Sequence, residues 1–149
     1  MPQAGVRGAA TVGYSSTPLP QKLGLKDGQR VLFLDLPESL DELATSRSFV
    51  DASKAGWPAL KTARNYDLIH GFTPSRAVLE KAAKSLPAAI TRDGTVWISW
   101  PKKASKMPTD IDDNVIREVL LPTGLVDVKV AAVDDIWSGL KLVIRKELR

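Results

Sequence analysis

The chain has 149 residues, of which 44% are apolar and 26% are charged, and its formal net charge is +4. This length and composition predict a globular protein with a sizeable core, and no apolar run approaches the length of a membrane span. The sequence has no Cys and one His, which excludes disulfides, thiolate catalysis and a multi-histidine metal site. We therefore expect a cytoplasmic protein with no metal ion and no membrane contact.

Two regions differ in composition. Residues 1–16 are rich in Gly, Ala, Ser and Thr and show no apolar periodicity, which predicts a flexible N-terminal arm. The hydroxyl-rich stretch 14–17 leaves a second possibility open, an arm that folds across a pocket. Residues 17–149 contain no linker and no internal repeat, so they are predicted to form a single domain.

The domain begins with a short helix and a buried strand. Thr17 followed by Pro18 is typical of a helix start, and Gly24 can end this helix in the left-handed conformation. The continuous apolar run at 31–34 indicates a strand that is covered on both faces, as in parallel sheets.

A second helix and two further strands are expected next. Ser39 and Glu42 form a capping-box pattern, which predicts a helix from Leu40 to a position within 53–56. Residues 57–61 are read as a short edge strand. Residues 66–72 (YDLIHGF) are read as the next buried strand.

The following stretch repeats the order of helix and strand. Thr73-Pro74 predicts another capped helix start, with apolar residues at helical spacing over 78–86. Residues 92–94 (RDG) indicate a turn. Residues 96–100 are rich in β-branched and aromatic side chains, which favours a strand.

The C-terminal part predicts one helix and a hairpin. Thr109 or Asp110 is expected to cap the helix. Apolar and charged residues alternate over 126–130 and 140–144, which indicates two antiparallel strands with one wetter face. The sequence therefore predicts a three-layer α/β fold of the Rossmann-like type, with a mostly parallel sheet and a C-terminal antiparallel hairpin.

This order of elements resembles the class I S-adenosylmethionine methyltransferases, whose fold ends in an antiparallel hairpin. Four stretches carry the resemblance over about residues 19–146: LGLKDGQRVLFLDL, YDLIHGF, LPAAITRDGTVWISW and LLPTGLVDVKV. The resemblance implies a methyltransferase-like scaffold.

The chain departs from that family at its cofactor loop. The family loop typically reads Val-Leu-Asp-Leu-Gly-x-Gly-x-Gly, and its glycines fall on Asp35, Pro37 and Ser39 when it is aligned from Val31. Glycine permits close approach of the cofactor and positive φ, whereas Pro37 removes an N–H donor. A carboxylate at Asp35 would lie near the cofactor's own carboxylate, and like charges at about 4 Å repel by roughly 4 kcal/mol at an effective dielectric near 20.

The family also holds the ribose hydroxyls with an acid after its second strand. If that strand is 57–61, the following residues 62–64 offer no acid; Asp51 would serve only if the strand is 48–50. The sequence therefore predicts that the scaffold is kept, that the S-adenosylmethionine pocket is lost and that no cofactor is bound.

A second resemblance is to a bacterial domain-of-unknown-function family. It is carried by GYSSTPLPQKLGLK, WPKKASKMPTDI and LVDVKVAAVDDIWSGLKLV. Members commonly show Tyr-Ser-Gly-Thr-Pro-Leu and Trp-Pro-Lys-Lys-Ala-Ser, and here Ser16 stands in place of the Gly. This resemblance implies no reaction and no catalytic residue.

A candidate binding site follows from the predicted topology. Ligands of open α/β sheets gather beyond the carboxyl ends of the parallel strands. Three lysines beside a serine after the 96–100 strand can hold a phosphate or a carboxylate, although a solvated basic loop explains them as well. The candidate ligand-binding residues at this edge are Asp35, Thr73, Trp100, Lys102, Lys103, Ser105 and Lys106. No catalytic residue is predicted, and His70 and Trp97 are expected to be buried packing residues.

Three functions remain open at this stage. The first is a non-catalytic methyltransferase-like domain that binds an anionic small molecule or a protein partner at the strand ends. The second is a divergent S-adenosylmethionine-dependent methyltransferase. Nucleic-acid binding through the basic loop and the basic C-terminal residues ranks last, because no stacking aromatic residues lie among the basic ones.

Overall fold

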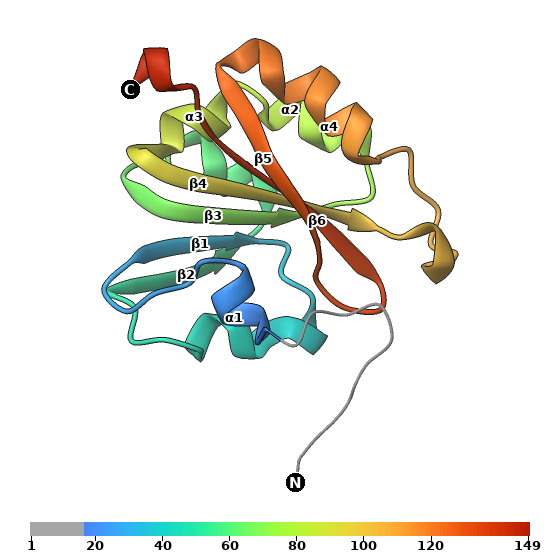
Figure 1. Cartoon of the computed structure of the whole chain (residues 1–149), viewed down its shortest axis with the longest axis horizontal. Helices are drawn as coiled ribbons and strands as arrows, with labels where there is room; N and C mark the ends of the chain where they lie inside the picture. Colours follow the sequence, from blue (N-terminus) through green and yellow to red (C-terminus); the bar gives the residue numbers. More distant parts are fainter. Residues whose placement is uncertain (1–16) are drawn as a thin grey trace, which may run out of the picture.

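The computed structural model describes residues 17–149 as a three-layer α/β fold (Figure 1). Six strands form one sheet in the order β2-β1-β3-β4-β6-β5. The strands are β1 (Arg30–Leu34), β2 (Asp51–Ala55), β3 (Tyr66–Phe72), β4 (Ile90–Pro101), β5 (Leu125–Ala132) and β6 (Trp137–Ile144). β1 to β4 run parallel, and β6 pairs antiparallel with both β4 and β5. The predicted fold class is therefore confirmed. The expected arm 1–16 lies outside the described residues.

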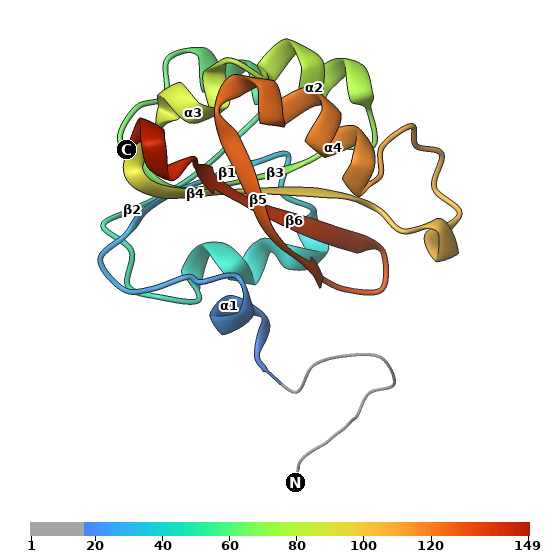
Figure 2. The same cartoon turned by 45° about the horizontal axis from the view of Figure 1, so that its top comes forward.

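The helices lie on both faces of the sheet (Figure 2). One face carries α2 (Arg76–Ala82), α3 (Ser85–Ala89) and α4 (Asp113–Leu120), and the other carries α1 (Leu19–Lys22) and a 3₁₀ helix at Glu38–Thr45. The larger buried cluster lies on the α2 side and includes Leu79, Ile98 and Ile116. The smaller cluster lies on the α1 side and includes Phe33 and Trp97, whose indole N–H donates to the carbonyl of Leu23. Among the described residues, no helix is long and apolar enough to cross a membrane.

Several predicted elements differ in type. The helix expected from Leu40 is a 3₁₀ helix that begins at Glu38 after Pro37, so the Ser39 capping box does not form. Residues 53–56, expected near its end, belong to β2 or follow it directly. The predicted strand at 57–61 is wrong: Trp57–Lys61 is a 3₁₀ helix that buries Trp57 and Leu60 three residues apart, and Pro58 in its first turn has no N–H for a strand ladder.

The predicted helix caps are also displaced. α1 begins at Leu19 with Pro18, not Thr17, before it, whereas Gly24 has the expected positive φ of 77°. Ser75 and not Thr73 caps α2 by accepting the Val78 N–H.

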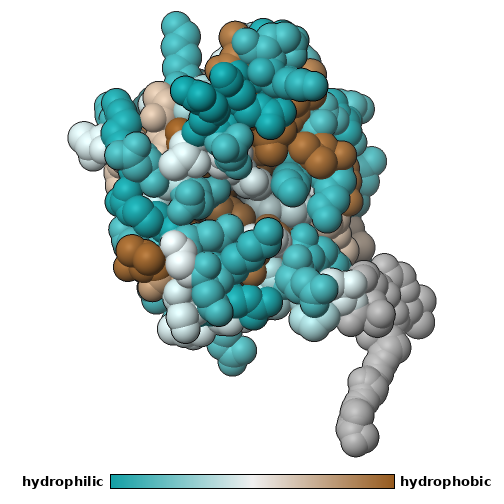
Figure 3. Space-filling view, turned by 60° about the vertical axis from the view of Figure 1, so that its left-hand side comes forward, coloured by the Kyte–Doolittle hydropathy of each residue, from teal (hydrophilic) through white to brown (hydrophobic). Residues whose placement is uncertain are grey.

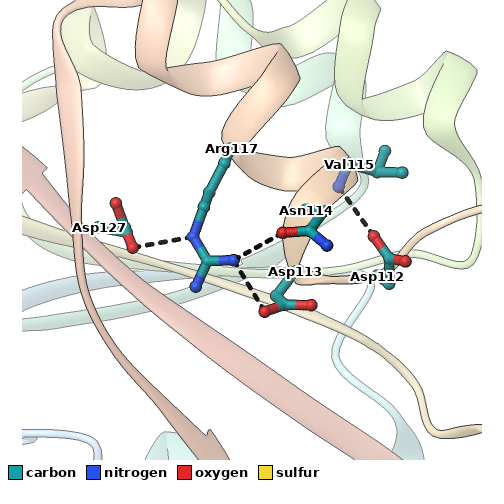
Figure 4. A network of polar contacts seen from close by, with 6 residues as sticks. All are labelled: Asp112, Asp113, Asn114, Val115, Arg117 and Asp127. Carbon is teal, nitrogen blue, oxygen red and sulfur yellow. Dashed lines mark hydrogen bonds and ion pairs between the residues drawn. The ribbon is translucent and has the colours of Figure 1, made fainter.

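α4 likewise begins later than predicted. Asp112 accepts the Val115 N–H and caps this helix (Figure 4). Asp110 instead accepts the Arg76 N–H, and Thr109 donates to the Pro74 carbonyl. The two expected caps therefore attach the loop before α4 to the start of α2.

The turn predicted at 92–94 lies within the long strand β4. The register between β3 and β4 shifts between Tyr66 and Leu68, so the chain passes through this stretch as an irregular part of the strand.

A bulge in β5 divides its polar residues between the two faces of the sheet. Asp127 pairs with Leu142, and Lys129 pairs with the adjacent Lys141, because the register shifts between them. Asp127 therefore faces α4, where Arg117 Nε donates to it at 2.9 Å and Arg117 Nη1 donates to Asp113 at 2.8 Å (Figure 4). Lys129 lies on the opposite face, so the single wetter face predicted from the alternation is wrong for β5. It is correct for β6, where Leu140 and Leu142 are buried and Lys141 lies on the other face.

His70 and Trp97 are both fully buried, as expected. His70 Nε2 lies 2.7 Å from Ser99 Oγ, and the ring stacks on Phe72 with a centroid separation of 4.2 Å. Within residues 17–149, Nδ1 of His70 is the only buried side-chain polar atom without a hydrogen-bond partner. Burial lowers the pKa of His70 to about 3, because a charged ring would lose its hydration without gaining an acceptor.

We predict that His70 makes the protein acid-sensitive. The unfolded chain binds a proton near pH 6.5 and the folded chain does not, so the free energy of unfolding falls as the pH drops below 6.5. The loss between pH 7 and pH 5 should be roughly 2 kcal/mol, from about 1.4 kcal/mol per pH unit. Denaturant unfolding at both pH values measures it. The His70→Gln variant should lose most of this pH dependence, while Ser99→Ala should keep it. An unchanged pH dependence in His70→Gln would contradict the assignment.

Candidate functional site

The strand order of the sheet creates a switch point between β1 and β3. The chain leaves β1 toward β2 on one side and then crosses to β3 on the other side, and both β2 and β3 pair with β1. In open α/β sheets, the crevice beyond the carboxyl ends at such a point is the usual place for a ligand. Asp35 follows β1 and Thr73 follows β3, so these two predicted residues flank the crevice.

The chain's own side chains close much of this crevice. The indole of Trp57 packs on Gly71 of β3, and its N–H donates to the Phe72 carbonyl at 3.0 Å. On the other face of the sheet, Phe72 meets Trp137 edge-on at 5.3 Å, and Leu36 packs against this pair. A ligand therefore cannot enter between the ends of β1 and β3 unless these side chains move.

An open hollow remains on the β2 side of the crevice. It has a volume of about 470 Å³ and is lined by Asp35, Leu36, Glu38, Asp41, Lys54, Ala55 and Gly56. Pro37, expected to obstruct the cofactor loop, does not line it. Three carboxylates and one ammonium group face the hollow, and Lys54 pairs with Asp41 at 2.6 Å. The charge balance of the hollow favours a cation or hydroxyl donors over an anion.

Asp35 has a left-handed backbone conformation, which glycine adopts more readily than other residues. Its φ is 54°, and its N–H donates to the Ala55 carbonyl at 2.9 Å. Its carboxylate turns toward the end of β2, since Oδ1 lies 3.7 Å from the position that a Cβ on Gly56 would take. Gly56 thus leaves the Asp35 carboxylate accessible at the end of β2.

The structure separates the predicted site residues into two groups. The loop after β4 extends beyond β6 at the right of the view, away from the end of β1 (Figure 1). In this loop Ser105 Oγ donates to the Lys102 carbonyl and accepts the Met107 N–H, and Lys106 has a φ of 61°. Lys103 is exposed, and Lys102 donates its backbone N–H to Ile136. The lysine loop and Asp35 therefore do not form one pocket.

The other two predicted residues, Thr73 and Trp100, serve the packing of the edge. Thr73 is buried, its N–H donates to the Ser99 carbonyl, and its Oγ1 accepts the Ser75 N–H. Trp100 is also buried and belongs to the core cluster on the α2 side. Neither side chain lines the hollow beside Asp35.

Sequence reasoning missed Gly56, Trp57 and Gly71. Gly56-Trp57 directly after β2 is the signal for an indole ring that turns back over the sheet. The sequence pattern instead predicts the strand at 57–61, so it does not reveal this signal. Asp51, the alternative ribose acid, begins β2 and so lies at its amino end, where it pairs with Arg30. The residue after β2 is Gly56, so the described chain has no acid at the place where class I methyltransferases are expected to hold the ribose.

Comparison with known proteins gives a structural likeness and no sequence likeness. No family model matches the chain, and no curated protein matches its sequence. A SAM-dependent methyltransferase from Aquifex aeolicus superposes with a TM-score of 0.63 at 15% identity, covering 84% of this chain and 87% of that chain. The fold is methyltransferase-like.

Two further structures agree on the fold. The fibrillarin pre-rRNA processing protein of Methanococcus jannaschii has a TM-score of 0.56 at 12% identity, covering 89% of this chain and 70% of that one. The magnesium protoporphyrin IX methyltransferase of Synechocystis PCC 6803, with bound SAM, also has a TM-score of 0.56 at 12% identity, covering 80% and 71%. At these identities the likeness establishes the architecture alone.

We predict that Gly71 is required because Trp57 lies against it. A Cβ at Gly71 would come within 2.5 Å of the indole Cζ2, so Gly71→Ala should lower the free energy of unfolding by about 1–3 kcal/mol through overpacking. Gly56→Ala is the matched control, since its Cβ would meet its nearest atom at 3.6 Å and its φ is −87°. Denaturant unfolding should show little change for this control. Equal losses in both variants would contradict the proposed contact.

Proposed function

We propose that the hollow beside Asp35 binds the ribose of an S-adenosylmethionine-type cofactor and that the chain is a divergent methyltransferase. The observation that carries this proposal is the Asp35 carboxylate, which lies beside Gly56 at the edge of an open hollow. In the related family an acid after the second strand holds the ribose hydroxyls. Here Asp35 from β1 reaches the end of β2 and can take that role.

The chemistry of the hollow fits this group. Ribose hydroxyls donate hydrogen bonds, and a carboxylate accepts them strongly. A sulfonium cation is favoured near Asp35 and Glu38, both of which line the hollow. The cofactor would supply an electrophilic methyl group, and the chain's residues would bind and orient it. The likeness in fold to SAM-dependent methyltransferases supports this function over a non-catalytic role.

A second candidate is a non-catalytic domain that binds an anionic small molecule or a protein partner at Lys102, Lys103 and Lys106. The filled crevice favours this candidate, because Trp57 occupies the space over Gly71 and Leu36 packs on the other side. Thermal-shift measurements with phosphate and phosphorylated metabolites test it. A Lys102→Ala/Lys103→Ala variant should lose any stabilisation that such anions produce.

We predict that the Asp35→Asn variant loses affinity for S-adenosylmethionine. Isothermal calorimetry of the wild type should give a micromolar Kd. Replacing the carboxylate should weaken binding by about 10- to 100-fold, the value of a hydrogen bond to a charged group.

Asp93→Asn is the control, because Asp93 is exposed in β4 and does not line the hollow, and its affinity should equal that of the wild type. Absence of heat at millimolar cofactor, or equal affinity in Asp35→Asn and the wild type, would rule the site out.

A further inference from the structure

The bulge in β5 brings together lysines that are far apart in the sequence. Lys129 of β5 and Lys141 of β6 are cross-strand partners on the α1 side of the sheet. Lys22 of α1 reaches the same strand, where its Nζ donates to the Ala132 carbonyl at 3.0 Å. Lys26 follows α1, and its charge acts on Lys141. We call Lys22, Lys26, Lys129 and Lys141 the lysine row.

These charges have no carboxylate partner in the part of the chain that the structure describes. The ion pairs of residues 17–149 use Arg30, Lys54, Arg76 and Arg117 as their cations. Asp127, the acidic residue next to Lys129 in β5, faces α4 because of the bulge and is bound by Arg117. Within residues 17–149, no ion pair therefore neutralises a lysine of the row.

The lysines of the row act on one another. Burial lowers the pKa of Lys22, and the charges of Lys102 and Lys129 lower it further. Burial likewise lowers the pKa of Lys141, followed by the charges of Lys129 and Lys26. Lys129 therefore acts on both Lys22 and Lys141, and an anion bound beside these lysines relieves the repulsion among them.

The shape of this surface suits an extended anion. A hollow of about 460 Å³ between α1 and β5 is lined by Lys22 and Lys129, among others. Lys22 contacts β5 at Ala132, three residues beyond Lys129, and a strand rises by about 3.3 Å per residue, so this part of the row extends over roughly 10 Å. A nucleic-acid backbone carries one negative charge per nucleotide, so successive phosphates can lie along a row of this kind.

We propose that the lysine row binds the phosphodiester backbone of a nucleic acid. This inference goes beyond the proposed function, because the row lies over β5 and β6 and shares no residue with the hollow beside Asp35. The sequence ranks nucleic-acid binding last, since no stacking aromatic residues are evident among the basic residues of loop 102–106 and of the C-terminal segment, to which Lys141 belongs. Backbone binding needs no stacking, because the salt-dependent release of counterions supplies the affinity.

Fluorescence anisotropy with labelled 20-nucleotide duplex DNA and single-stranded RNA of mixed sequence tests this proposal. Four lysines that neutralise phosphates give a slope of log K against log salt of about −3.6 for duplex and −2.8 for single strands. Duplex affinity should therefore fall about 100-fold between 50 and 200 mM NaCl. The Lys129→Ala/Lys141→Ala variant should reduce the slope by about half, so that its affinity falls only about 10-fold over the same range.

The matched control is Lys61→Ala/Lys81→Ala, which removes the same charge from exposed residues on the α2 side of the sheet. This control should keep the wild-type slope, and Asp35→Asn should keep it as well. Thermal unfolding verifies that each variant is folded.

Absence of nucleic-acid binding at 50 mM NaCl would overturn the proposal, and so would an equal change of slope in the control variant. The proposal would also fail if the protein bound phosphatidylserine vesicles through Lys129 and Lys141 but bound neither nucleic acid. Because the Asp35 variant and the lysine variants are read out by different ligands, failure of one proposal does not affect the other.

Discussion

The packing of Trp57 on Gly71 is the contact on which the carboxyl edge of the sheet depends. Trp57 belongs to the crossover that carries the chain from β2 at the sheet edge to β3 next to β1. Its ring covers the end of β3, and its indole N–H satisfies the Phe72 carbonyl at the point where that strand ends. A buried indole needs such a partner, so one residue both anchors the crossover and closes the switch point. The space left for a ligand is confined to the β2 side.

The chain divides its charges between two ends of the sheet. Asp35, Glu38 and Asp41 gather where β1 and β2 end, and the lysine row lies over β5 and β6. The formal net charge of +4 conceals this separation. The acidic hollow attracts cationic ligands and repels anionic ones, whereas the lysine row does the reverse. The side of the molecule on which the parallel strands begin is mostly hydrophilic, and its hydrophobic residues form patches between hydrophilic ones (Figure 3).

The C-terminal hairpin is covered unequally on its two faces. On one face Arg117 joins α4 to Asp127 of β5, and Leu140 and Leu142 of β6 enter the core. The other face contacts the short α1, whose Lys22 donates one hydrogen bond to β5, and its Trp137 packs against Leu36 and Leu40. β5 is an edge strand of the sheet, and the charge of Lys129 opposes its pairing with strands of other chains.

Several strands follow from local patterns of residues alone. The apolar run of β1, the YDLIHGF stretch of β3 and the alternation of β5 and β6 identify strands, because burial on one or both faces requires those patterns. The predicted mostly parallel sheet with a C-terminal antiparallel pair is confirmed. The loss of the glycine loop also follows from the sequence, since Asp35 and Pro37 occupy its positions.

The contents of the carboxyl edge of the sheet depend on contacts between segments that are distant in the sequence. The sequence predicts a strand at 57–61, yet Trp57–Lys61 is a 3₁₀ helix in the crossover to β3 and buries Trp57 and Leu60 three residues apart. The direction of the Asp35 carboxylate depends on its φ and on Gly56, which is distant in the sequence. The lysine row depends on a one-residue bulge, which changes the face of every side chain after it and leaves no trace in the alternation of residues.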